Sequence, residues 1–270
     1  MSSRALDRSA RFLMAFAAVL MLTAPALHAE AGGWDRAQAL YADGHYLEAA
    51  EAAAALETAP GEALAARALL AAATTGRGNA ARAHVAQAVL TARRAIARDP
   101  GVLEGHLQLA VALGFQGRAI GNIPAHERGL AREARAAIDA ALALAPADAW
   151  ARSLDGSWHL EIVSGAGPLL ASALYGADRS HGIAALRAAA TDPAASPIVI
   201  HQCALQLLAH DAGTFGREAA RWLAAAAARN GADAFERHTI RQAERLLRAW
   251  RSGHASYLGY EVARQQRQGT

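Results

Sequence analysis

Apolar and polar positions repeat along this chain with the period of an α-helix. In residues 128–145 the apolar side chains recur every three or four positions, and the opposite face carries Arg128, Arg132, Arg135 and Asp139. Residues 81–98 and 236–251 show the same single apolar stripe. Each of these segments therefore predicts an amphipathic helix that buries one face.

Four prolines recur at intervals of roughly 40 to 47 residues, a spacing typical of helical-repeat arrays. Pro60, Pro100, Pro146 and Pro193 each stand at the end of an alanine-rich segment. Proline cannot continue a helix, because it lacks the backbone N–H and restricts the residue before it. We therefore predict that each proline closes a helical run.

Glycine-containing breaks are expected at 44–45, 74–79, 165–168 and 230–231, and the longest irregular segment at 114–124. Residues 197–200 are β-branched, but a helical pattern follows, so we interpret them as a helix start. The chain is thus predicted to be all-α, with about ten to twelve helices in antiparallel pairs. We expect these pairs to stack as a right-handed α-solenoid. A compact helical bundle is the alternative, and long-range contacts would close it.

The N-terminal segment has the pattern of an export signal. Arg4, Arg8 and Arg11 precede an uncharged apolar run at 12–22, which is far shorter than the ~20 residues that span a bilayer. We predict a signal peptide at 1–29, cleaved after Ala29 or, with a better small-residue match, after Ala31. An uncleaved anchor is the alternative. Residues 30–270 would then form one helical-repeat domain in the periplasm, without stable membrane insertion.

The composition excludes two further classes of protein. The formal net charge is +3 and there is no lysine, and the arginines alternate with acidic residues without a long basic run. A nucleic-acid partner is therefore not expected. Cys203 is the only cysteine, which excludes an internal disulfide and predicts a small core residue.

Residues 37–60 resemble a tetratricopeptide repeat. Gly44, Tyr46 and Ala49 match the turn glycine, the aromatic residue and the small residue at the helix crossing, and Pro60 stands near the expected repeat end. The later repeats are longer than the ~34 residues typical of the family. This resemblance implies a tetratricopeptide-like α-solenoid.

A second segment, 154–177, resembles divergent tetratricopeptide proteins that include the regulators of microtubule dynamics. It is also similar, more weakly, to the exported helical-repeat components associated with TRAP transporters. The residues that carry this resemblance are Gly156-Ser157-Trp158 and Leu174-Tyr175-Gly176, before an alanine-rich helix that ends near Pro193. It implies the fold and does not imply a microtubule role.

Two groups of residues are candidates for a binding site. Asp155 and His159 are four positions apart and share a helix face, with Tyr175 beyond them. They could line a groove, although we favour an Asp–His pair that ties the helix to the next loop, with Trp158 in the core. Arg118 and Asn122, in the glycine-containing segment, could line one end of a groove.

No motif indicates catalysis. The segment 114–122 lacks the preceding strand and glycine order of a dinucleotide site, and without lysine there is no phosphate loop. The histidines lack metal-ligand spacing, and there is no nucleophile elbow. We therefore expect no metal, no cofactor and no enzymatic activity.

These observations favour an exported scaffold or binding protein for a protein or peptide partner in the cell envelope. The alternative is a small-molecule carrier or enzyme with a pocket around Trp158, His159 and Tyr175. An enclosed pocket with convergent polar groups would favour this alternative, and an open groove would favour the scaffold.

Overall fold

The computed structural model describes residues 32–76 and 78–268, so the predicted signal peptide lies outside the described residues. Within these ranges the regular structure is entirely helical, which confirms the all-α class. These described residues form 13 helices, one more than the largest number expected. A first helix at 32–43 is followed by α2 (Tyr46–Ala54), α3 (Ala59–Thr75), α4 (Gly78–Arg98), α5 (Leu103–Ile120), α6 (Asn122–Glu127), α7 (Leu130–Leu144), α8 (Ala149–Ala166), α9 (Pro168–Tyr175), α10 (Arg179–Ala190), α11 (Pro197–Ala227), α12 (Ala234–Arg251) and α13 (Ala255–Gln266).

Short polar side chains begin many of these helices. Thr58, Asp148, Asp178, Ser196 and Asp233 each accept a hydrogen bond from the backbone N–H three residues later. Such caps satisfy N–H groups that have no partner inside the helix. The helix boundaries are therefore determined locally.

Two expectations about the breaks were wrong. Pro60 lies in the first turn of α3, where a missing N–H costs nothing. It therefore stands at the start of a helix and does not close the helical run before it. The segment 114–124 is not irregular, because α5 continues through Gly114 and Gly117 to Ile120 and α6 begins at Asn122. Helix α5 packs on α3, α4 and α7, and this packing outweighs the weak helix propensity of glycine.

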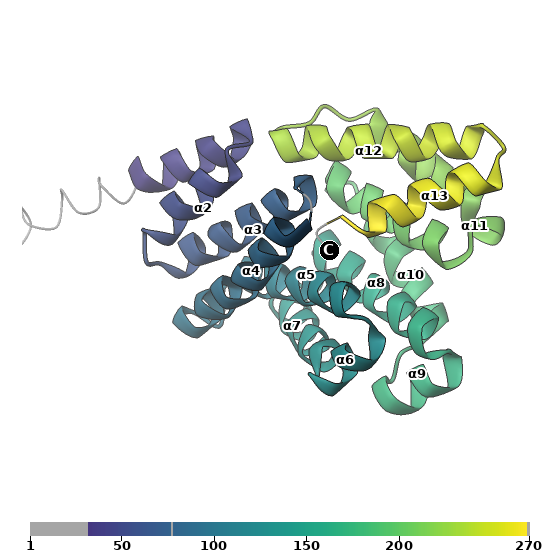
Figure 1. Cartoon of the computed structure of the whole chain (residues 1–270), viewed down its shortest axis with the longest axis horizontal. Coiled ribbons are helices and arrows are strands. Elements are labelled where there is room, and N and C mark those ends of the chain that lie inside the picture. Colours follow the sequence, from purple (N-terminus) through teal and green to yellow (C-terminus); the bar gives the residue numbers. More distant parts are fainter. Residues whose placement is uncertain (1–31, 77, 269–270) are drawn as a thin grey trace, which may run out of the picture.

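Helices that follow one another in the chain also pack against one another (Figure 1). Close contacts join α2 to α3, α3 to α4, α4 to α5, α5 to α7, α7 to α8, α8 to α10, α10 to α11 and α11 to α12. Alanine fills many buried positions between them, including Ala49, which has no exposed surface. Cys203 is also fully buried, and burial raises the pKa of its thiol to about 12.

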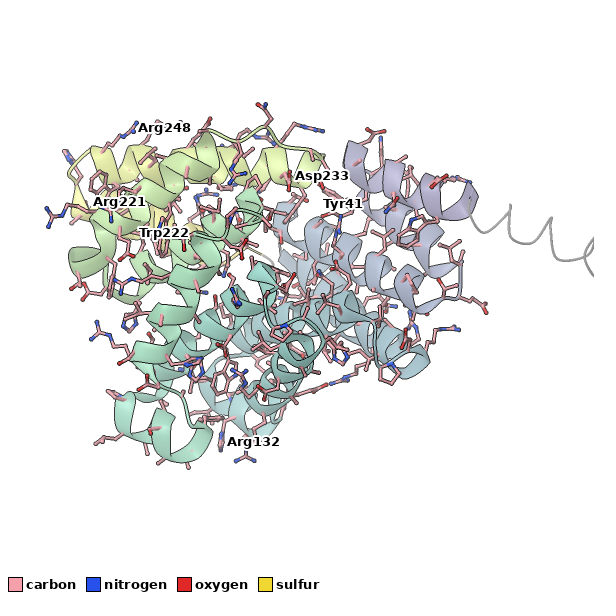
Figure 2. The ribbon with its side chains drawn as sticks, turned by 180° about the vertical axis from the view of Figure 1, so that it is seen from behind. Tyr41, Arg132, Arg221, Trp222, Asp233 and Arg248 are labelled. Carbon is pink, nitrogen blue, oxygen red and sulfur yellow. The ribbon has the colours of Figure 1, made fainter. Side chains whose placement is uncertain are left out.

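The start of α12 meets the first helices of the chain. The rings of Tyr46 and Phe235 lie edge to face with centroids 6.3 Å apart, and Arg237 donates to the carbonyl oxygen of Ala42. Figure 2 shows Tyr41 and Asp233 close together at this junction. Long-range contacts therefore bring the N-terminal and C-terminal helices together.

None of the helices in the described ranges is long and apolar enough to cross a bilayer.

Candidate functional site

Two glycines bring α8 and α10 unusually close. A Cβ atom on Gly156 would lie 2.7 Å from the carbonyl oxygen of Gly182, and one on Gly182 would lie 3.1 Å from that of Gly156. Only glycine allows the backbones this approach. The crossing places His181, the residue before Gly182, over the face of α8 that carries Asp155 and His159.

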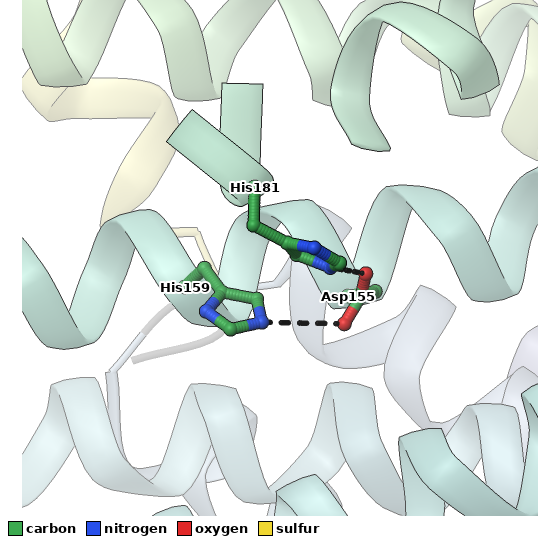
Figure 3. A group of neighbouring side chains, drawn as sticks. All are labelled: Asp155, His159 and His181. Atoms are coloured by element: carbon green, nitrogen blue, oxygen red, sulfur yellow. Dashed lines mark hydrogen bonds and ion pairs between the residues drawn. The ribbon is translucent and has the colours of Figure 1, made fainter. Parts of the chain in front are cut away.

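Asp155 is the centre of a polar cluster (Figure 3). One carboxylate oxygen lies 2.7 Å from Nε2 of His181, and the other accepts a hydrogen bond from Arg135 at 2.5 Å and lies 3.6 Å from Nε2 of His159. Burial alone would raise the pKa of Asp155, but the hydrogen bonds from Arg135 and His181 outweigh burial and lower it. Asp155 is therefore an ionised acceptor at neutral pH.

The backbone fixes the tautomer of His159. Its Nδ1 accepts the N–H of Asp178 at 2.9 Å, so Nδ1 carries no proton and Nε2–H points to Asp155. Burial lowers the pKa of His159, and the positive charge of Arg135 adds to this effect. A neutral His159 thus ties α8 to the loop before α10.

The nitrogen and oxygen atoms of Asp155, His159 and His181 all lie within 4.8 Å of one another, a spacing that could hold a metal ion. A histidine that binds metal through Nε2 normally donates its Nδ1–H to a neighbouring acceptor. His159 instead faces a donor at Nδ1, and the guanidinium of Arg135 already occupies the carboxylate of Asp155. The protonation pattern therefore suits a hydrogen-bonded cluster and does not suit a metal centre.

Aromatic side chains border this cluster. Trp158 is buried, and its indole N–H donates to the carbonyl oxygen of Ala131 at 2.9 Å. Tyr175 at the end of α9 lies edge to face with Trp158, and its hydroxyl group forms a hydrogen bond with His126. Together with the cluster these residues line an open side pocket of about 310 Å³.

Of the predicted site residues, the structure brings Asp155, His159 and Tyr175 together in this side pocket. Arg118 and Asn122 are not part of it. Asn122 donates at 3.4 Å to the carbonyl oxygen of Gly165, near the end of α8. Arg118 lines a different and larger space.

That larger space is a central cavity of about 470 Å³. Its wall comes from the first helix, α3, α5, α7, α8, α11 and α12, and from residues at and after the end of α13. In Figure 1 the end of α13 lies near the middle of the view. Tyr41 of the first helix and Phe235 of α12 both line this cavity. Of the predicted site residues, Arg118 thus lines the central cavity, Asp155, His159 and Tyr175 line the side pocket, and Asn122 lines neither.

Paired polar groups line the central cavity. Arg118 donates to Glu161 at 2.8 Å, and Gln206 donates to the same carboxylate at 2.7 Å. Arg67 lies 3.7 Å from Glu104, and its guanidinium lies over the ring of Tyr41. These pairs join helices that are distant in the sequence.

Two polar atoms of the cavity-lining residues are buried without a hydrogen-bond partner in the described structure: Nε of Arg118 and Oγ of Ser157. An unpaired buried polar atom costs about 1–3 kcal/mol. Ser157 and Glu161 are one helical turn apart on α8, opposite Arg118. The wall of the cavity therefore retains unused capacity for hydrogen bonds.

Sequence reasoning missed His181, Arg135 and Glu161. The dipeptide His181-Gly182 was the available signal for the first, since a glycine in α10 opposite Gly156 marks a close helix crossing. Nothing local indicated that Arg135 pairs with Asp155 or that Glu161 pairs with Arg118, because these partners lie on other helices. In comparisons with known proteins, no family model and no curated protein matches this sequence.

Proposed function

We propose that this protein is a binding protein that holds a small ligand in its central cavity. The observation that carries the proposal is the cavity itself, where charged and amide side chains from distant helices converge. Ligand sites are typically concave spaces of ~300–1,000 Å³ with a few placed polar groups. The cavity of about 470 Å³ falls in this range and favours a carrier over a scaffold with an open groove.

We propose further that the fold is a tetratricopeptide-like right-handed α-solenoid whose ends meet. The packing of successive helices supports this, as does the full burial of Ala49 at the expected helix crossing. The N-terminal pattern supports export to the periplasm. N-terminal sequencing of the mature chain tests that part, and a mature chain that begins at Met1 would contradict it.

Gly114 provides a test of the cavity. It lies inside α5 and lines the cavity, and a Cβ atom there would meet only Arg118 at 3.7 Å. Gly114→Leu should therefore be tolerated at its Cβ and should place an apolar side chain in the cavity. It also removes a helix-interior glycine that costs about 1 kcal/mol. The expected result is an unchanged or higher melting temperature together with loss of the bound ligand.

The assay is extraction of small molecules from natively purified protein, followed by mass spectrometry. Gly259→Leu is the matched control, because Gly259 lies in α13 with open space around it and outside the cavity. The wild type and Gly259→Leu should retain a compound that Gly114→Leu lacks. Identical extracts from all three chains would contradict the proposal.

A partner protein in the cell envelope is the second candidate ligand. Leu169, Leu170 and Leu174 on α9 are 87%, 56% and 51% exposed, and residues 162–177 contain no charged side chain. Such an apolar helix face suits an apolar surface of another protein. A photo-crosslinker at Leu170 should form one specific adduct that Leu174→Ser weakens, with a crosslinker at Arg248 as control. An adduct with a second copy of the chain, or none, would contradict this candidate.

A further inference from the structure

The charges on the wall of the central cavity are unbalanced. Five carboxylates but only two guanidiniums line it. Arg67 pairs with Glu104, and Arg118 pairs with Glu161. Both guanidiniums are thus already neutralised within the wall.

The remaining carboxylates are Asp148, Asp233 and Glu236. The hydrogen bonds that they accept in the described structure come from backbone N–H groups of Ala151, Glu236 and Ala232. They lie at the N-termini of α8 and α12, each of which carries a partial charge of about +0.5. An excess of about two negative charges is left, in a chain whose formal net charge is +3.

The cavity histidines do not restore the balance. Burial lowers the pKa of His201 to about 4, and burial together with nearby arginines lowers the pKa of His238. Both are therefore neutral at pH 7. The acidic excess among the lining side chains is therefore present at pH 7, with Arg241, Arg245 and Arg264 close enough to His238 to lower its pKa.

One further feature suits a ligand with hydrogen-bond donors. Ser157 is 6% exposed, and its hydroxyl oxygen has no partner in the described structure. Ser157 lines the cavity, so its hydroxyl oxygen is an unused acceptor beside the space where a ligand N–H would lie.

We propose that the central cavity binds an organic cation, that is, an alkylammonium or guanidinium group carried by a free amine or by a basic side chain of a peptide. The proposal rests on the proposed small-ligand function. The ligand cation would neutralise part of the negative charge of Asp148, Asp233 and Glu236, which form no ion pair with a guanidinium in the described structure. Anionic ligands would meet the same carboxylates and be rejected.

The test is isothermal titration of the full chain with spermidine, with a capped trilysine peptide and with glutarate. We expect spermidine or trilysine to bind and glutarate not to bind. Binding of spermidine alone would identify a free amine, and binding of trilysine would identify a basic peptide segment. The double variant Asp148→Asn/Asp233→Asn should weaken cation binding about tenfold, since asparagine keeps both helix caps and removes both charges.

Asp178→Asn is the matched control, because Asp178 caps α10 outside the cavity. Its affinity should equal that of the wild type. Glutarate binding that Gly114→Leu abolishes would overturn the cation proposal and leave the small-ligand function intact. Absence of binding by any probe, or equal loss in Asp178→Asn, would also overturn the cation proposal, and the extraction experiment decides the function separately.

Discussion

The crossing of α8 and α10 allows a quantitative test of the packing. Gly156→Ala would place a Cβ atom 2.7 Å from the carbonyl oxygen of Gly182 and 2.7 Å from Cγ of Leu186. Carbon atoms pack best about 3.5–4.0 Å apart, so the two helices must separate by roughly 1 Å. The oxygen belongs to the backbone of α10 and cannot rotate away.

Overpacking of this kind lowers the free energy of unfolding by about 1–3 kcal/mol, and the better helix propensity of alanine offsets about 0.5–1 kcal/mol of this loss. We expect a net loss of about 2 kcal/mol, which lowers the melting temperature of a chain of this size by roughly 4–8 °C. Thermal and urea unfolding followed by circular dichroism measure it. Gly259→Ala, with open space around its Cβ, should be neutral or slightly stabilising.

The reasoning would be refuted if Gly156→Ala were as stable as the wild type. The helices would then be further apart than described. The position of His181 over Asp155 would be wrong for the same reason, because the close crossing brings that side chain into place. A loss of stability in both Gly156→Ala and Gly259→Ala would indicate a general effect on helices and would not support the crossing.

Three further changes test other parts of the molecule by urea unfolding. Ala49→Leu should cost about 1–3 kcal/mol, because Ala49 has no exposed surface, and a neutral result would mean that the first helix pair is misplaced. Trp158→Ala should cost about 3–5 kcal/mol, and a loss below about 1 kcal/mol would contradict its place in the core. His201 has a pKa of about 4 in the folded chain against 6.5 when unfolded, so the unfolded chain gains a proton below pH 6.5 and stability falls towards pH 4, by roughly 3 kcal/mol. His201→Gln should show a flatter pH dependence over this range, and equal slopes would exclude His201 as the cause.

Local signals in the sequence predicted the helices well. The apolar stripes at 81–98, 128–145 and 236–251 correspond to α4, α7 and α12 within a few residues. Gly167, with φ of 78°, and the Asn230-Gly231 pair mark breaks where they were expected. These features depend on backbone preferences and helical periodicity, which neighbouring residues determine.

Glycine in α5 shows where such signals are insufficient. Gly114 and Gly117 predicted a break, yet both lie within the helix. A glycine costs only about 1 kcal/mol in a helix, and burial of apolar residues such as Leu107 and Leu113 exceeds that amount. The sequence alone does not determine whether the low helix propensity of glycine or the burial of apolar side chains is larger, because the burial depends on what packs against α5.

The same distinction between local sequence and tertiary structure applies to the candidate sites. The sequence by itself determined that Asp155 and His159 share a helix face, since four residues make about one helical turn. Only the tertiary structure decided that His181 and Arg135 complete the cluster, that Arg118 belongs to a separate cavity, and that α12 meets the first helices. Small rotations between successive helices add up along the whole chain, so contacts between residues 195 positions apart cannot be derived from any local pattern.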